Sequence, residues 1–63
     1  MNNSKLPIQI TPDVLLDIQQ ERLELLYSDG TLCEESLYDF SEEVVNQVKE
    51  VGRELNLTID HLI

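Results

Sequence analysis

The most regular part of this sequence is residues 31–55, TLCEESLYDFSEEVVNQVKEVGREL. Its apolar residues recur at spacings of 4, 3, 4, 4, 3 and 4, which place them on one face of an α-helix. They are Cys33, Leu37, Phe40, Val44, Val48, Val51 and Leu55. Thr31 and Glu34 fit a capping box at the start. The pattern predicts one amphipathic helix over residues 32–55, about 36 Å long at ~1.5 Å per residue, with Asn56 ending it.

Residues 12–28 predict a second helix. Thr11 can cap it, and Pro12 suits the first helical position because its missing amide hydrogen is not needed there. Acidic residues at spacings of 4, 4 and 3 would form a stripe facing water: Asp13, Asp17, Glu21 and Glu24. Ser28-Asp29-Gly30 would then break the chain before the next helix. The expected fold class is therefore all-α, an antiparallel helical hairpin.

The two ends of the chain carry weaker patterns. Residues 1–10 are predicted to be an extended arm or an edge strand, because Leu6, Ile8 and Ile10 alternate with other residues and Pro7 cannot donate to a sheet. At the other end, Thr58 can cap a short helical turn over residues 58–63. A strand is the alternative there, since apolar residues also alternate. Residues 1–63 are interpreted as a single domain.

Self-association is predicted from the small size and the apolar surface. A chain of 63 residues has a marginal core on its own. The first helix would carry two apolar rows, Leu15-Ile18-Leu25 and Leu16-Leu23-Leu26, which is more than one hairpin can bury. A homodimer forming a four-helix bundle would cover the excess. In the alternative, the arm and tail cover it within one subunit. In either case, a core seam would line the core or the dimer interface: Leu37, Phe40, Val44, Val48, Val51 and Leu55.

The charge is strongly acidic, with 13 Asp and Glu against 4 Lys and Arg, a formal net charge of −9. Five acids crowd the start of the predicted 32–55 helix, and we call them the acidic ridge: Glu34, Glu35, Asp39, Glu42 and Glu43. The helix dipole favours acids there, so a solvated face is one interpretation. The other is a docking surface for a basic protein, with the ridge acting as a nucleic-acid mimic.

Residues that carry chemistry are scarce. One cysteine allows neither an internal disulfide nor a four-cysteine zinc site. Cys33 and His61 would lie at opposite ends of the 32–55 helix, too far apart to form a nucleophile pair within one chain. Neighbouring carboxylates diverge around a helix, and no glycine-rich phosphate loop is present. We therefore expect no catalytic, cofactor-binding or metal site, and a protein that is not an enzyme.

Two resemblances bear on architecture. Residues 6–11, then Pro12, a helix, a glycine-containing turn and a second helix resemble the ribbon-helix-helix family of DNA-binding dimers. That resemblance implies a DNA-binding regulator or antitoxin, with Lys5, Pro7 and Gln9 facing the major groove. Residues 35–43, ESLYDFSEE, resemble the second helix of the Rop family of RNA-binding hairpins, an architectural analogy only. One basic residue in the ribbon and the acidic charge oppose direct nucleic-acid binding.

The sequence thus predicts a small acidic regulatory protein that acts by binding another protein, as an inhibitor, adaptor or anti-activator. The DNA-binding regulator is the alternative, and a structural subunit of a larger assembly is a further alternative. No apolar run has the length of a signal peptide or a membrane span, which predicts a cytoplasmic protein without a membrane partner.

Overall fold

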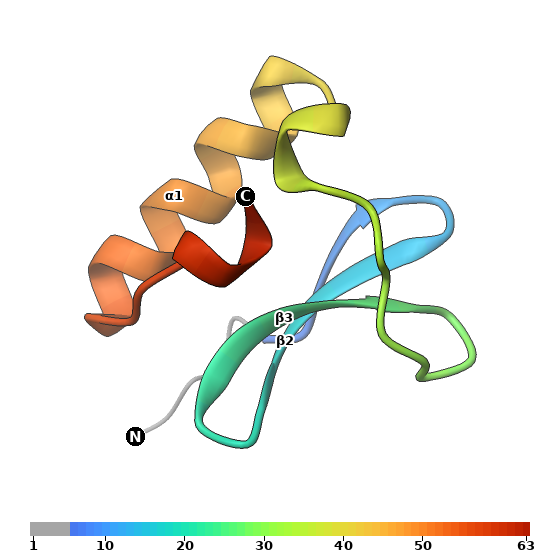
Figure 1. Cartoon of the computed structure of the whole chain (residues 1–63), viewed down its shortest axis with the longest axis horizontal. Coiled ribbons are helices and arrows are strands. Elements are labelled where there is room, and N and C mark those ends of the chain that lie inside the picture. The colour runs from blue at the N-terminus through green and yellow to red at the C-terminus, as the bar shows by residue number, and fades with distance from the viewer. Residues whose placement is uncertain (1–5) are drawn as a thin grey trace.

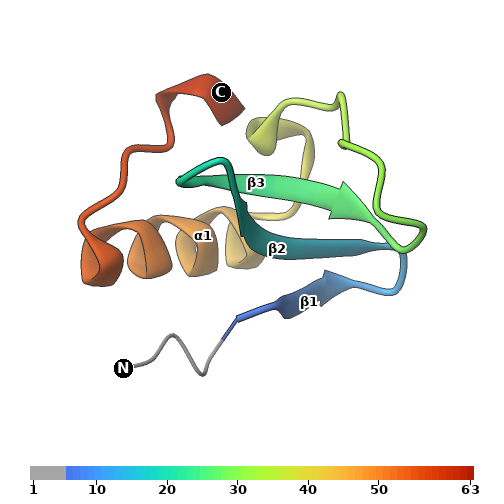
Figure 2. The same ribbon diagram turned by 90° about the horizontal axis from the view of Figure 1, so that it is seen from below.

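The computed structural model describes residues 6–63. The elements in chain order are β1 (Ile8–Thr11), β2 (Val14–Gln19), β3 (Arg22–Tyr27), the 3-10 turn η1 (Leu37–Asp39), the helix α1 (Glu42–Leu55) and the 3-10 turn η2 (Asp60–Leu62). The strands form an antiparallel sheet in the order β1-β2-β3, and α1 packs across one face of it (Figures 1 and 2). The fold is α+β, so the prediction of an all-α helical hairpin is wrong.

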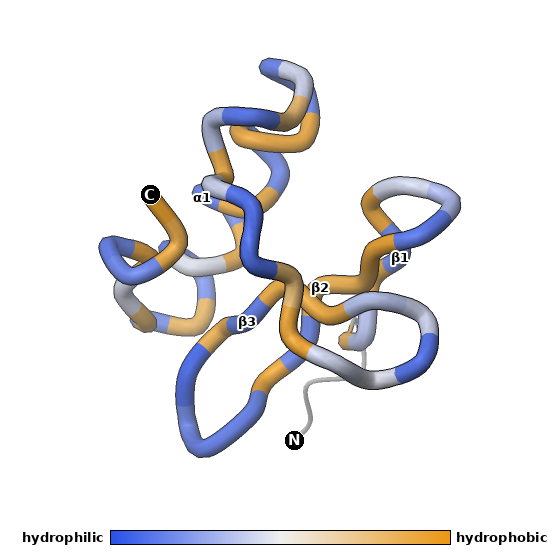
Figure 3. Tube along the Cα trace, turned by 45° about the vertical axis from the view of Figure 1, so that its right-hand side comes forward, coloured by the Kyte–Doolittle hydropathy of each residue, from blue (hydrophilic) through white to orange (hydrophobic). Residues whose placement is uncertain are grey.

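The predicted 12–28 helix is instead a β-hairpin. Strands β2 and β3 pair from Val14↔Tyr27 to Gln19↔Arg22. The two residues between them, Gln20 and Glu21, have φ angles of 56° and 66°, as in the type I′ turn that matches the twist of paired strands. This turn is entirely polar (Figure 3). The predicted acidic stripe therefore does not exist, because its members are divided between two turns and two strands.

The sheet also explains why the hairpin carries so many leucines. Side chains alternate between the two faces of a strand. Leu16 and Leu25 are paired and lie in the core, whereas the next pair along the strands, Leu15 and Leu26, lies on the opposite face. Apolar residues on both faces hide the period of two and imitate a helix. The propensities of Leu, Gln, Glu and Arg strengthen that imitation.

Only the second half of the predicted 32–55 helix is helical. Helix α1 begins at Glu42, where the Ser41 hydroxyl accepts a hydrogen bond from the Val44 amide at 3.3 Å. Residues 31–36 instead follow the outer edge of β3. The Tyr27 amide donates to the Thr31 carbonyl at 2.7 Å, and the Cys33 amide donates to the Leu25 carbonyl at 2.7 Å. The capping box proposed at Thr31 is therefore wrong, and the true cap lies ten residues later.

Helix α1 ends at Leu55, the residue predicted from the sequence. Asn56 adopts the left-handed conformation, with a φ of 59°, and the Leu57 amide donates to the Gly52 carbonyl at 2.9 Å. This is the hydrogen-bond pattern of a Schellman cap. The tail then returns to the sheet, where η2 buries Leu62 in the core. Residues 58–63 thus contain the helical turn and not the alternative strand. The cap predicted at Thr58 is wrong, because Ile59 precedes η2 and no side chain caps it.

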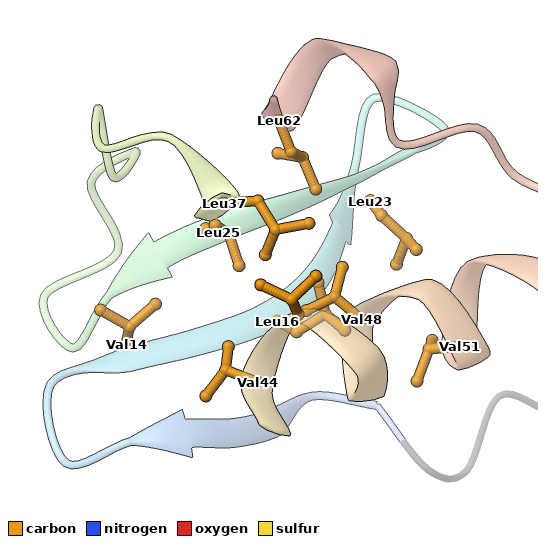
Figure 4. Close-up of a cluster of buried hydrophobic side chains, with 10 residues drawn as sticks. Val14, Leu16, Leu23, Leu25, Leu37, Val44, Val48, Val51 and Leu62 are labelled. Atoms are coloured by element: carbon orange, nitrogen blue, oxygen red, sulfur yellow. The ribbon is translucent and has the colours of Figure 1, made fainter. Parts of the chain in front are cut away.

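The core lies between the sheet and the elements on its one covered face. Its fully buried side chains come from β2, β3, η1 and α1, and Figure 4 shows them converging: Leu16, Leu23, Leu25, Leu37 and Val48. Within the core seam, Leu37, Val44, Val48 and Val51 are buried, while Phe40 and Leu55 pack against the core half-buried. The sheet covers this surface within one chain, so the predicted four-helix bundle is wrong. Homodimerisation through a different surface stays a prediction.

The two family resemblances do not hold as architecture. Within residues 6–63, α1 is the one α-helix, and β1 pairs with β2 of the same chain. A ribbon-helix-helix dimer needs two helices and a strand that pairs between subunits, and a Rop-like hairpin needs two long helices. The DNA-binding alternative is left without the architecture it required. Residues 1–5 of the predicted arm, with Lys5, lie outside the described part of the chain.

Candidate protein-binding surface

The acidic ridge lies at the end of the molecule where α1 begins (Figure 1). Glu34 and Glu35 belong to the connection that follows β3, Asp39 to η1, and Glu42 and Glu43 to the first turn of α1. All five side chains are exposed. The ridge is therefore a folded stretch of ten residues and not one face of a long helix.

No cation in the described part of the chain forms an ion pair with the ridge. Arg22 pairs with Glu24 at 3.0 Å, and Arg53 pairs with Glu50 at 3.1 Å. The Lys49 ammonium lies 5.8 Å from the centre of the Tyr38 ring. Glu42 and Glu43 gain from the helix dipole, which favours acids in the first turn. The ridge is thus a concentration of negative charge that the described chain leaves uncompensated.

Tyr38 gives this surface an aromatic residue. It is 56% exposed and follows the cap of η1, where the Ser36 hydroxyl accepts from the Tyr38 amide at 3.2 Å. The Lys49 ammonium lies over the Tyr38 ring and makes a cation–π contact with it. Tyrosine is enriched among the residues that dominate the energetics of protein interfaces. Tyr38 lies outside the helical spacing of the apolar residues, and no pattern in the sequence singled it out as a surface residue.

The structure brings Cys33 and His61 closer together than predicted. Both reach the outer edge of β3, Cys33 through its amide on Leu25 and His61 through Nε2, which lies 2.6 Å from the Leu23 carbonyl. The prediction that they lie at opposite ends of a helix is wrong, because the tail folds back. Glu24 lies 3.9 Å from His61 Nε2. The His61 ring therefore holds η2 against the edge of β3.

The Cys33 thiol has a partner of another kind. A hydrogen bond between this thiol and the Tyr27 hydroxyl raises the pKa of Tyr27 above its ordinary value of 10.0, with further contributions from Glu35 and Glu34. Cys33 is half-buried and packs against the core. These contacts fit a structural role for the thiol.

Outside the ridge, two further features of the described residues bear on chemistry: the placement of metal-binding groups and one pocket. Among residues 6–63, no three His, Cys, Asp or Glu side chains are grouped so as to hold a metal ion. A pocket of about 220 Å³ lies between the β2–β3 turn and the end of α1, lined by Glu21, Arg22, Asn56, Leu57 and Thr58. None of the ridge residues lines it. No helix within the described residues has the length and apolar character to cross a membrane.

Comparison with known proteins gives no relative. A scan against protein-family models found no match, and searches of the curated proteins and of the solved structures found none either. The candidate surface is therefore defined by its own geometry and charge.

Proposed function

We propose that this chain is a small acidic regulatory protein that acts by binding another protein, and that the acidic ridge docks on a basic surface of that partner. The single observation that supports the proposal is the set of five exposed carboxylates within ten residues, unpaired with any cation in residues 6–63. Cationic groups on a partner would relieve the repulsion among them and speed association.

Tyr38 supports a protein as the partner. An exposed aromatic ring among carboxylates can anchor an interface whose rim is charged, because apolar burial supplies affinity while charge supplies specificity and association rate. An inhibitor, an adaptor and an anti-activator all fit this description. In the sharper version, the ridge imitates a nucleic acid in the groove of its binding protein. A cytoplasmic location is part of the proposal.

Affinity capture from the native cell extract tests the proposal with two charge-matched variants. In the ridge variant, all five ridge acids are changed to Gln or Asn. The control variant removes five exposed acids elsewhere: Asp13, Glu21, Glu50, Glu54 and Asp60. Both variants have the same net charge.

We expect a protein that binds the native chain and the control variant but not the ridge variant, with binding that weakens steeply as salt is raised. Equal loss in both variants would mean that total charge, and not the ridge, attracts the captured protein. A partner retained by the ridge variant, or binding that ignores salt, would contradict the proposal.

A further inference from the structure

The face of the sheet opposite α1 carries three leucines in a line, which we call the leucine row. Leu15 of β2 pairs with Leu26 of β3, and Leu26 pairs with Leu32 through an isolated bridge beyond the edge of β3. Directly paired residues present their side chains on the same face of a sheet. The row therefore crosses the sheet at right angles to the strands, on the face that no helix covers (Figure 2).

The leucine row is an apolar feature in its own right and not the edge of the core. Leu26 is 8% exposed, yet it is not a member of the core cluster beneath α1. Its neighbours in the row are Leu15, which is half-buried, and Leu32, which is 50% exposed. The exposed apolar area of the row therefore belongs to Leu32 and in part to Leu15, which lie on either side of the buried Leu26.

The next row on the same face is acidic. Asp17 lies directly opposite Glu24, an arrangement in which like charges repel. Glu24 has Arg22 at 3.0 Å. The Asp17 carboxylate accepts a hydrogen bond from the adjacent Ile18 amide at 2.8 Å, and no cation in residues 6–63 pairs with it. The face thus combines an apolar row with a neighbouring carboxylate that has no counter-ion within residues 6–63.

We infer that this face is a second docking surface, and that its occupant is a cationic amphipathic segment of a partner protein. Apolar side chains of the segment would cover the leucine row, and a Lys or Arg would lie beside Asp17. A second copy of this chain fits less well, because it would bring its own acidic row and a charge of −9 against the same face. The inference does not rest on the acidic ridge, since apolar contact and not charge alone defines this surface.

An NMR titration of the ¹⁵N-labelled protein tests the inference with three synthetic peptides. The first is an amphipathic Leu/Lys peptide, the second its Leu/Glu counterpart, and the third a Ser/Lys peptide of equal charge without an apolar face. We expect the Leu/Lys peptide to shift the amides of Leu15, Asp17, Leu26 and Leu32. The Leu/Glu and Ser/Lys peptides should leave these amides in place.

Two variants with similarly exposed side chains sharpen the test. Leu32→Ser should weaken Leu/Lys peptide binding at this face about fivefold, because the exposed half of the side chain would no longer be buried. Ile63→Ser removes a side chain of similar exposure (53%) that belongs to neither candidate surface and should change that affinity by less than about twofold. Amide dispersion in each spectrum reports that the variant is folded.

Each other outcome overturns the inference in a recognisable way. Shifts confined to Asp39, Glu42 and Glu43 with both lysine peptides would leave the acidic ridge as the only docking surface and remove this one. Equal shifts of the leucine row with the Leu/Glu peptide would rule out a cationic occupant. Shifts of the row that depend on protein concentration without peptide would identify a second copy as the occupant. Absence of shifts at both surfaces would contradict this inference and weigh against the proposed function as well.

Discussion

The β2–β3 turn allows a substitution whose effect on stability has opposite signs in a hairpin and in a helix. Gln20 and Glu21 hold φ angles of 56° and 66°, and this left-handed region costs an L residue about 1–2 kcal/mol. Asn-Gly is the pair that favours a type I′ turn. The double variant Gln20→Asn, Glu21→Gly should therefore remove most of the strain. Glycine itself lowers the stability by about 0.5–1 kcal/mol, because it gives the unfolded chain more conformational entropy. The expected net gain in stability is therefore about 1–2 kcal/mol.

Urea denaturation followed by circular dichroism measures this gain as a higher midpoint at an unchanged slope. A thermal scan should show a rise in Tm of about 5–15 °C, given the unfolding entropy of a domain of this size. Gln47→Gly is the matched control. Together with Asn46 it creates the same Asn-Gly dipeptide, at two exposed positions of α1. There the change should destabilise the protein by about 1 kcal/mol.

A double variant that loses as much unfolding free energy as the Gln47→Gly control would refute the hairpin turn. That result is expected if residues 12–28 were helical, since Asn and Gly together are less favourable than Gln and Glu in a helix by about 1–1.5 kcal/mol.

Three further predictions concern the cap, a turn and a close contact. Ser41→Ala should destabilise the protein by about 1 kcal/mol through loss of the α1 cap; no change in the urea midpoint would argue against a helix start there. Hydrogen bonds from the Thr31 amide and hydroxyl lower the pKa of Asp29 below its ordinary value of 3.8, so this contribution is complete above that pH and lost as the pH falls through the folded value. The urea midpoint of the native chain relative to Asp29→Asn should accordingly decline below about pH 4, and a difference that stays constant would contradict the assignment. Gly52→Ala should destabilise the protein by up to about 2 kcal/mol, because the new methyl group would lie 3.1 Å from both the Leu57 carbonyl oxygen and the Ile59 side chain. This overpacking costs about 1–3 kcal/mol and is only partly offset by the gain of about 1 kcal/mol in helix propensity; a rise in the melting temperature would contradict this close contact.

The sequence predicted α1 well where local patterns govern structure. From Val44 to Leu55 the helical spacing of apolar residues coincides with real burial, and Asn56 ends the helix as its tolerance of the left-handed region suggests. The helical pattern extended too far toward the N-terminus because Leu37 is buried in η1 and Phe40, beside it, packs half-buried against the core. Both residues stand at positions that continue the helical spacing. Ser41 carried the correct signal for the start.

The hairpin could not be predicted from local preference. Its turn has neither Gly nor Asn, and its residues favour a helix unless a sheet and α1 bury alternate side chains. The helical interpretation grouped Leu15 with Leu25 in one row, whereas the register of the sheet places them on opposite faces. For that reason the leucine row could not be predicted from the sequence. The acidic ridge could be predicted, because it depends only on composition and exposure.

The fold and the leucine row both depend on the claim that residues 14–27 form a hairpin. The most direct test is a nuclear Overhauser spectrum of the protein. The Ser28 amide donates to the Asp13 carbonyl at 3.1 Å, which makes Leu16↔Leu25 a non-hydrogen-bonded pair of the ladder. Such pairs bring their Cα atoms within about 4.5 Å, so we predict a strong contact between the Hα atoms of Leu16 and Leu25. A series of Hα–Hβ contacts at i,i+3 through residues 12–28, without that cross-strand contact, would contradict the account.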